Sequence, residues 1–390
     1  MSLREVLRRA PWFSRSTLDP GTARVLDSLE IEGTTLRWVE VRGEHHAATL
    51  VLAEDDASLL RALLMLTTRE FWPTKSSVVR WRGPVQSLLQ LDEVLNTTAT
   101  NAVGRVAGDL MIKAYRVLGD DRGEPVLLST VDGGDLLPVP LGYLEYEGSC
   151  LALITHVVQG VPLDHALREA LRSGTAPPAR LLRAVREALT ALHCRLAAGT
   201  EVKAMPLTER LPELESLVRQ VRGTLPPGSP RHELLDQCAA FPLSADYPAG
   251  PRHGDLHLGH VLVDSARRVR FVDPDGQALG TSSPLDDFAA LCRAVECFAA
   301  DEETDRAARA LGVDKVDLAR SQESALGAEW AAEVTRELTS GTELNAVALP
   351  YVLRTLHELR YHGERAGDPD ADYYADLTWA SLADFLKGFL

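Results

Sequence analysis

Two aspartates at the ends of a short hairpin are the residues best suited to chemistry in this chain. Asp255 lies within residues 253–260, and Asp273 lies within residues 272–276. Between them, residues 261–271 hold two apolar runs around a polar tip, which predicts two strands and a turn. The hairpin would bring the two carboxylates together. Phosphoryl transfer uses such a pair, because one carboxylate orients an attacking hydroxyl and the other holds Mg²⁺ on nucleotide phosphates.

The elements around this hairpin form a strand-rich first part and a helical second part. Residues 36–41 alternate as a strand does and 47–53 could pair with them, whereas 59–67 fit a buried helix or a buried strand. Further strands are expected at 102–106, 109–115, 136–143 and 150–155. Helices are expected at 2–11, 163–172, 178–197, 208–222, 285–298, 301–311, 316–338, 350–362 and 373–389, with a loop at 223–231.

Lys113 is the cationic residue of interest in the strand-rich part. It lies between Ile112 and Ala114 in an apolar strand. Such a lysine could lie at a sheet edge and point to solvent, or it could neutralise a phosphate. Its position upstream of the aspartate hairpin favours the phosphate. His193 falls on or beside the apolar stripe of its helix, and we interpret it as a packed histidine rather than a catalytic one.

Composition limits the class of protein. The chain has 390 residues, enough for two or three domains, and its 45% hydrophobic and 25% charged residues are typical of a soluble globular protein. The net charge of −15 argues against nucleic acid as the main partner. No apolar run approaches the roughly 18–20 residues of a membrane span, and the N-terminus lacks a secretory pattern. Five cysteines without metal-binding spacing indicate buried thiols, so we expect a cytoplasmic protein without a membrane partner.

Several segments, in the same order along the chain, resemble the actinobacterial maltokinases and their glucosamine-kinase relatives, within the aminoglycoside-phosphotransferase-like kinase fold. The most specific match covers residues 253–262, which resemble the family's HGDLHLGQVL, and 283–289, which resemble SPLRDVA. Weaker matches lie at 9–13, 100–101, 112–116 and 356–361.

The resemblance implies an α+β protein with the bilobal fold of eukaryotic protein kinases. It implies an extra N-terminal α/β cap domain at residues 1–95 and a β-rich nucleotide-binding lobe at 96–160. A mostly helical C-terminal lobe with the catalytic loop and the acceptor site would occupy 161–390. The implied reaction is direct in-line transfer of the γ-phosphate of ATP to a hydroxyl of a sugar or aminosugar, without a covalent intermediate.

The resemblance also assigns roles to residues. Asp255 would be the catalytic base, and Asp273 with Asp275 would hold the metal, although Asp275 and its glycine are also a common turn pair. His253, His257 and Asp287 would support the catalytic loop. The nucleotide would be bound by Lys113, Thr100, Asn101, Glu124, Thr155, His156, Val157 and Val158, with Glu124 as the candidate partner of Lys113. The acceptor would be met by Glu358, Arg360, Tyr361 and His362.

Three positions depart from the family pattern. His260 stands where the family has a glutamine and related kinases have an asparagine, which bind Mg²⁺ through oxygen. Imidazole suits transition metals better, so His260 could bind the metal poorly, act through water or favour Mn²⁺. His362 replaces a glutamate, and residues 364–368 replace the Arg-Pro-x-Trp of maltokinases, which puts maltose in doubt as the acceptor.

The leading hypothesis is therefore a cytoplasmic kinase of a sugar or aminosugar that uses ATP with Mg²⁺ or Mn²⁺ and acts as a monomer or weak homodimer. An acidic chain also suits a cationic antibiotic, so an aminoglycoside phosphotransferase is the second hypothesis. The third is a nucleotide-binding regulatory protein that has lost catalysis, which His260 motivates.

Overall fold

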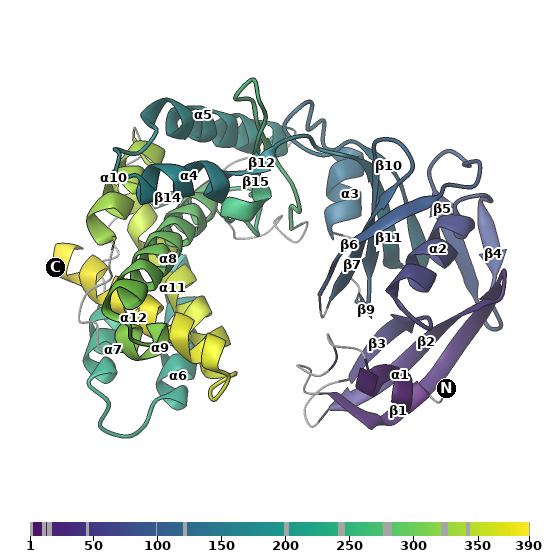
Figure 1. The fold of residues 1–390 in the computed structure, drawn as a ribbon, viewed down its shortest axis with the longest axis horizontal. Helices are drawn as coiled ribbons and strands as arrows, with labels where there is room; N and C mark the ends of the chain where they lie inside the picture. The colour runs from purple at the N-terminus through teal and green to yellow at the C-terminus, as the bar shows by residue number, and fades with distance from the viewer. Residues whose placement is uncertain are drawn as a thin grey trace. The chain divides into compact units, whose positions relative to one another are not determined.

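A computed structural model describes the chain apart from residues 1–2, 10–12, 14–17, 44–46, 99, 120–122, 199–202, 241–245, 276–282, 321–326, 341–343 and 390. Most of the segment 9–13 lies outside the described residues, and so does Gly276. This segment is one of the weaker matches to the family. The chain divides into two compact units, Met1–Val158 and Gln159–Leu390 (Figure 1).

The first unit contains two antiparallel sheets. One has the order β1-β2-β3-β9, with β1 at Leu18–Ile31, β2 at Thr34–Gly43, β3 at Ala47–Leu52 and β9 at Val117–Leu118. The other has the order β4-β5-β10-β11-β8-β7-β6, at Phe71–Pro73, Val78–Arg82, Pro140–Tyr146, Ser149–His156, Leu110–Tyr115, Asn101–Val106 and Leu91–Thr97 respectively. The helices are α1 (Leu3–Arg9), α2 (Asp56–Leu66) and α3 (Gly123–Thr130).

Helix α2 resolves the segment that the sequence left open between helix and strand. Asp55 caps its N-terminus by accepting a hydrogen bond of 2.7 Å from the Ser58 backbone N–H. The buried leucines include Leu59, Leu60 and Leu63, whose spacing places them on one helical face. They pack into the core of the first unit, and α2 lies beside the seven-stranded sheet (Figure 1).

The expected domain boundary at residue 95 runs through this core and does not separate two compact units. Strand β6 spans it, and β5 pairs directly with β10, with Tyr143 opposite Arg82 and Tyr146 opposite Val79. A single cluster of buried apolar side chains draws on both sides of the boundary. Residues 1–95 therefore share one sheet and one core with 96–158.

The second unit is mostly helical. Its strands are β12 (Val161–Pro162), β15 (Val261–Val263) and β16 (Val269–Phe271) in one sheet, and β13 (Lys203–Pro206) with β14 (Asp246–Ala249) in another. Its helices are α4 (Leu163–Arg172), α5 (Ala179–Leu196), α6 (Leu211–Thr224), α7 (Arg231–Ala239), α8 (Pro284–Leu311), α9 (Lys315–Arg320), α10 (Ala328–Leu338), α11 (Leu344–Gly363) and α12 (Pro369–Phe389). Two 3₁₀ turns are η1 (Leu207–Arg210) and η2 (Leu258–His260).

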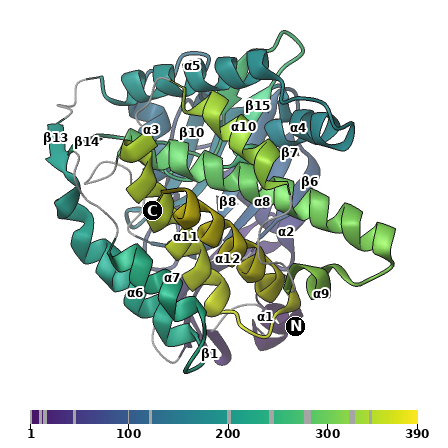
Figure 2. The same cartoon turned by 90° about the vertical axis from the view of Figure 1, so that its left-hand side faces the viewer.

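Helix α8 corrects the expectation of two helices at 285–298 and 301–311, because it continues without a break for 28 residues. It begins with a capping box formed by Ser283 and Asp286 and ends at Gly312, whose φ of 67° suits a left-handed C-cap. Between these signals the segment 299–301 contains no glycine or proline. Figure 2 shows α8 crossing the unit with α11 and α12, both of which contact it.

Other helix boundaries also differ from expectation. The segment expected as one helix at 316–338 contains α9 and α10, and α7 was not expected from the sequence. Helix α11 begins before Pro350 and carries this proline in its interior. Within the described part of the chain, no helix is both long and apolar enough to cross a membrane.

Candidate active site

The predicted aspartate hairpin is confirmed. Strands β15 and β16 pair with Val261 opposite Phe271 and Val263 opposite Val269. The base of the hairpin is closed by the Val272 N–H, which donates to the His260 carbonyl at 3.0 Å. His260 Nδ1 lies 3.9 Å from an Asp255 carboxylate oxygen, and Nε2 of the same ring lies 3.6 Å from an Asp273 carboxylate oxygen. Both carboxylates therefore approach one imidazole.

Gly254 allows the two ends of the hairpin to approach each other. Its φ is +91°, and a Cβ at this position would lie 2.8 Å from the Cβ of Asp275. The Asp275 N–H donates to the His253 carbonyl at 2.6 Å, which joins the two loops directly. Any larger residue at 254 would combine an unfavourable backbone conformation with a clash. Asp273, with φ of 57°, is one of four non-glycine residues in the left-handed region within the part of the chain that the structure describes.

Asp287, in the first turn of α8, holds the loop before Asp255 in place. Its carboxylate accepts from the backbone N–H groups of His253 at 2.6 Å and Gly254 at 3.0 Å, and from His193 Nε2 at 2.8 Å. The residue is only 1% exposed. Burial by itself would raise the pKa of Asp287, but the hydrogen bond and charge of His193 with the other partners lower it overall. Asp287 is therefore a buried carboxylate that several donors keep ionised.

His193 and Asp286 belong to this support, although the sequence analysis gave neither of them that function. His193 is packed, as expected, but its ring binds Asp287. Asp286 accepts from Arg252 Nη1 at 2.7 Å and also from Arg210, so it links the residue before His253 to η1. A polar residue on a buried helical face needs a partner. This rule predicts that the buried His193 has a hydrogen-bond partner, but it could not identify Asp287 as that partner.

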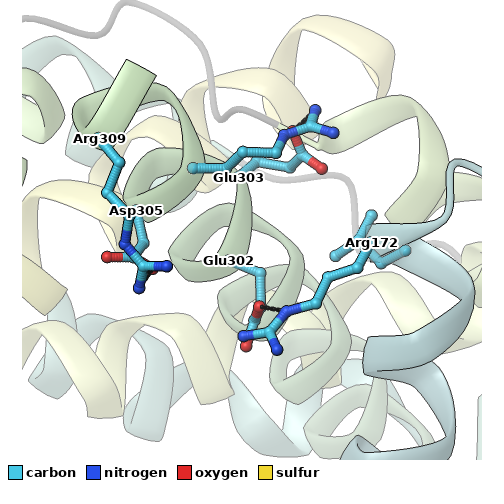
Figure 3. Close-up of a pocket in the computed structure, with 7 residues that line it drawn as sticks. Arg172, Glu302, Glu303, Asp305 and Arg309 are labelled. Atoms are coloured by element: carbon cyan, nitrogen blue, oxygen red, sulfur yellow. Dashed lines mark hydrogen bonds and ion pairs between the residues drawn. The ribbon is translucent and has the colours of Figure 1, made fainter. Parts of the chain in front are cut away.

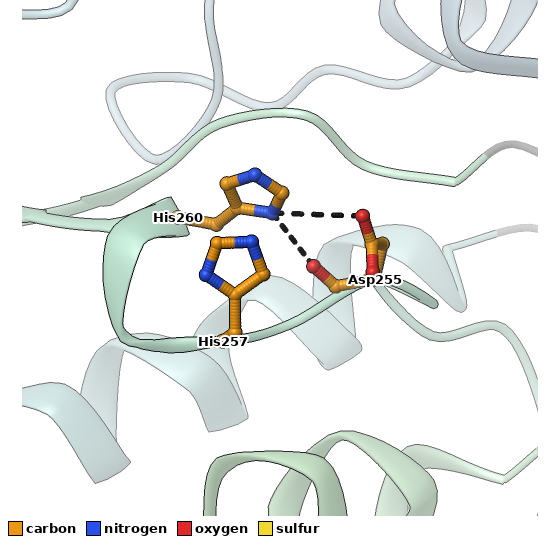
Figure 4. Close-up of side chains that lie close together, drawn as sticks. All are labelled: Asp255, His257 and His260. Atoms are coloured by element: carbon orange, nitrogen blue, oxygen red, sulfur yellow. Dashed lines mark hydrogen bonds and ion pairs between the residues drawn. The ribbon is translucent and has the colours of Figure 1, made fainter. Parts of the chain in front are cut away.

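The loop 253–260 carries three histidines whose ring nitrogens have different partners. The buried His253 donates from Nε2 to the Val272 carbonyl at 2.9 Å, and burial lowers its pKa. His257 accepts at Nδ1 from the Gly259 N–H at 3.1 Å. Burial and the neighbouring His260 lower the pKa of His257 to about 4. His260 donates from Nδ1 to the Asp255 carbonyl at 2.7 Å, as Figure 4 shows.

In the first unit, Lys113 lies on β8, which is flanked by β7 and β11. The alternative of a lysine on an edge strand is therefore wrong. Lys113 Nζ donates to Glu124 Oε2 at 2.7 Å, and the Tyr115 hydroxyl donates to the same oxygen at 2.7 Å. The two charged side chains are 16% and 10% exposed. Glu124, at the start of α3, is thus the carboxylate that pairs with Lys113.

The other residues expected to contact a nucleotide lie in the sheet that contains Lys113 or directly next to its strands. Thr100 and Asn101 close the hairpin between β6 and β7, where the Arg116 N–H donates to the Thr100 carbonyl at 2.7 Å. The buried Arg116 side chain also donates to the Thr98 carbonyl at 3.2 Å and pairs with Asp56. At the end of β11, residues 155 and 156 pair with β8, and the N–H of residue 157 donates to the Asp109 carbonyl. Val158 is the last residue of this unit.

The residues expected to meet the acceptor do not share one face of α11. Glu358 accepts from the buried Arg293 at 3.1 Å and from Arg354 at 3.1 Å. Arg360 faces α6, where it donates to Gln220 at 3.2 Å. Tyr361 is exposed and accepts from Arg365, while His362 is half-buried against Tyr374 with a pKa lowered by burial.

A hollow outside this region lies between α4 and α8 (Figure 3). Its charged side chains are paired with one another: Arg172 donates to Glu302 at 2.9 Å, Arg306 pairs with Glu303, and Arg309 pairs with Asp305. None of the residues singled out by the sequence analysis lines it. We attribute the hollow to ion pairing on a helical surface.

Among the described residues, Asp255, His257 and His260 form a group whose potential metal-binding atoms lie within 4.8 Å of one another. Asp273 lies beside the same group through its approach to His260. Carboxylate oxygens suit Mg²⁺, and an imidazole nitrogen together with carboxylates suits a wider range of divalent ions. The donor set therefore fits a divalent metal ion.

Comparisons with known proteins agree with this fold. Three solved structures described as glucosamine kinase resemble the fold at 17% identity. Crystal form B covers 100% of both chains with a TM-score of 0.57, and form A covers 96% of this chain and 95% of that one with 0.53. A complex with glucosamine, ADP and inorganic phosphate covers 97% and 98% with 0.52. No curated protein sequence matches the chain.

The decisive comparison is with a protein family. The phosphotransferase enzyme family (APH) matches residues 127–323, which make up half of the chain. This stretch contains the aspartate hairpin, the bracing carboxylates at the start of α8, and His193. The chain is therefore a member of the phosphotransferase enzyme family.

Proposed function

We propose that this phosphotransferase is a kinase that transfers the γ-phosphate of ATP directly to a hydroxyl of a sugar or aminosugar. The observation that carries the proposal is the hairpin that brings the carboxylates of Asp255 and Asp273 close to the His260 imidazole. The buried Asp287 carboxylate holds the backbone of the loop before Asp255. A loop fixed by buried hydrogen bonds can position an attacking hydroxyl, and positioning with charge stabilisation supplies most of the catalysis in phosphoryl transfer.

Asp255 acts as the base in this proposal. Its side chain is 55% exposed, so an acceptor hydroxyl can reach the carboxylate. Its backbone carbonyl is tied to His260, which limits the movement of the loop. The carboxylate then orients the hydroxyl and accepts its proton as the bond to phosphorus forms.

The nucleotide is held by two sets of residues in this proposal. Lys113, oriented by Glu124, neutralises phosphate charge, while Thr100, Asn101 and residues 155–158 contact the rest of the nucleotide. Asp273, Asp275 and His260 hold a divalent metal, which neutralises charge on the phosphates when bound. Mg²⁺ is the usual ion for this chemistry and Mn²⁺ is the second candidate.

A sugar-like acceptor is supported by the structures that resemble both units of the chain. One of these structures is a glucosamine kinase bound to glucosamine and ADP. The departures at His362 and at residues 364–368 argue against maltose itself. Glu358, paired with two arginines, and His362 form the part of α11 that we assign to the acceptor, while Arg360 faces α6.

The test is a panel of acceptors. Purified protein is incubated with ATP and either Mg²⁺ or Mn²⁺, and ADP release is followed with glucose, glucosamine, maltose and aminoglycosides. We expect turnover with glucosamine or another simple sugar. Turnover only with aminoglycosides would support the hypothesis of an antibiotic phosphotransferase. ATP binding without acceptor-dependent turnover would support the hypothesis of a regulatory protein.

Asp255→Asn is the internal control for this panel. The substitution keeps the size of the side chain and removes its basicity, so we expect turnover to fall by at least about a hundredfold. ATP binding should be retained, because Asp255 does not contact the nucleotide in the proposed mechanism. Unchanged turnover would exclude Asp255 as the base.

A further inference from the structure

The ring of His260 is held in one tautomer. Its Nδ1 donates to the Asp255 carbonyl at 2.7 Å, and a carbonyl can only accept, so the proton of the neutral ring lies on Nδ1. Nε2 therefore carries a lone pair. This nitrogen lies on the side of the ring that approaches Asp273, with a carboxylate oxygen at 3.6 Å.

The separation of 3.6 Å between Nε2 and this oxygen exceeds the length of a hydrogen bond. Two acceptor atoms also have no proton to share. Metal–nitrogen and metal–carboxylate bonds of about 2.1 Å bring two ligands of one ion to about 3.0–3.4 Å from each other. The observed separation of 3.6 Å is slightly longer than this range. The pair is thus arranged as two ligands of one ion.

His257 is in the wrong tautomer to join them. Its Nδ1 accepts from the Gly259 N–H at 3.1 Å, so the proton of the neutral ring lies on Nε2 and neither nitrogen is available to a metal. Its ring lies against that of His260, with centroids 3.6 Å apart, as Figure 4 shows. His257 therefore fixes the orientation of His260 without being a ligand.

We propose that His260 Nε2 and Asp273 bind a divalent transition metal, of the class of Mn²⁺, Co²⁺ and Zn²⁺, directly and more tightly than Mg²⁺, before any nucleotide is present. Imidazole nitrogen favours these ions over Mg²⁺. A hydrogen bond on the second ring nitrogen is the usual support of a metal-binding histidine, and here the Asp255 carbonyl provides it. One part of the inference rests on the proposed function: that this ion is the one that binds the nucleotide phosphates.

The test uses the nucleotide-free full chain and the metals alone. Co²⁺ is titrated while its visible absorption is followed, Mg²⁺ competes in a second titration, and pulsed EPR of bound Mn²⁺ detects coupling to imidazole nitrogen. We expect Co²⁺ and Mn²⁺ to bind at least about tenfold more tightly than Mg²⁺, with nitrogen coupling present.

His260→Asn is the decisive variant, with His260→Gln as a second in case the first fails to fold. Either should remove the nitrogen coupling and weaken Co²⁺ binding about tenfold or more, while Mg²⁺ binding is kept or improved. His257→Asn, whose amide oxygen can still accept from Gly259, should keep the nitrogen coupling and weaken Co²⁺ binding less than either His260 variant. The matched control is His165→Asn on the exposed surface of α4, which should leave Co²⁺ affinity within about twofold.

Three outcomes would overturn the inference: Mg²⁺ binding as tightly as Co²⁺, bound Mn²⁺ without nitrogen coupling, or Co²⁺ binding that depends on His257 instead of His260. None of these readouts requires turnover. If no acceptor in the panel is phosphorylated, the proposal of a metal site at His260 and Asp273 still stands. If an acceptor is phosphorylated but any of the three outcomes is found, the kinase proposal stands and the proposal of this metal site is excluded.

Discussion

Glu124 in the first unit and Asp287 in the second are both carboxylates that hold a group with a proposed role in catalysis, but they do so in different ways. Glu124 forms an ion pair with Lys113 and accepts a further bond from Tyr115, and both members of the ion pair keep some exposure. Asp287 is buried and holds two backbone N–H groups and a histidine. The first carboxylate orients one side chain, whereas the second fixes the path of the chain.

The largest expected effect comes from Asp287→Ala. Three donors, two of them buried, would lose their acceptor, so the free energy of unfolding should fall by about 3 kcal/mol or more, as measured by urea denaturation. The matched control is Asp305→Ala on the exposed part of α8, which should cost less than about 1 kcal/mol. A loss below about 1 kcal/mol at Asp287 would remove the distinction between the two carboxylates.

Glu124→Gln tests the other side of the comparison. The change removes the charge that orients Lys113, so we expect ATP affinity, measured by calorimetry, to fall about tenfold, which corresponds to about 1.4 kcal/mol. Stability should change by less than this amount, because the ion pair is partly exposed. Tyr115→Phe removes the hydrogen bond from the uncharged hydroxyl but keeps the ion pair, so it should have a smaller effect on ATP affinity. If Glu124→Gln unfolds the protein as Asp287→Ala does, the two carboxylates have the same function.

The arginine before His253 extends the comparison to Asp286. A double-mutant cycle of Arg252→Gln and Asp286→Asn should give a coupling energy of about 1 kcal/mol, since Arg252 is only partly buried. Denaturation of the four proteins measures it. We also expect turnover to fall in Arg252→Gln without a change in the KM for ATP, because the contact acts on the loop of the second unit. Additive single changes would show that this contact does not hold the loop.

A pH profile of stability gives the smallest effect. The folded pKa of His257 is about 4, below the ordinary value of 6.5, so in this window the unfolded chain binds a proton that the folded chain does not. Stability should therefore fall as pH decreases from 6.5 to 4, and His257→Asn should reduce that slope. Thermal unfolding across this range measures it. An identical slope in the variant would mean that His257 does not contribute to acid sensitivity.

The sequence predicted the hairpin, its two aspartates and the brace at Asp287, because the motif there is long and its spacing is fixed. It could not predict the partners of His193 and Asp286, since those contacts join segments far apart in the chain. Helix α2 stayed undecided because a short apolar run fits either structure when its packing is unknown. The domain boundary predicted near residue 95 differs from the structure for a related reason. The pairing of β5 with β10 joins segments far apart in the chain, and the sequence pattern does not show it.

The continuity of α8 has a mechanical consequence. At 1.5 Å per residue, its 28 residues make a rod of about 40 Å. Asp287 sits in the first turn of this rod, and the ion-paired side chains of Glu302, Asp305 and Arg309 lie towards its other end. A break near residue 300 would have isolated the two ends. Without one, the far end of α8 and the carboxylate that holds the backbone N–H groups of His253 and Gly254 belong to one continuous helix.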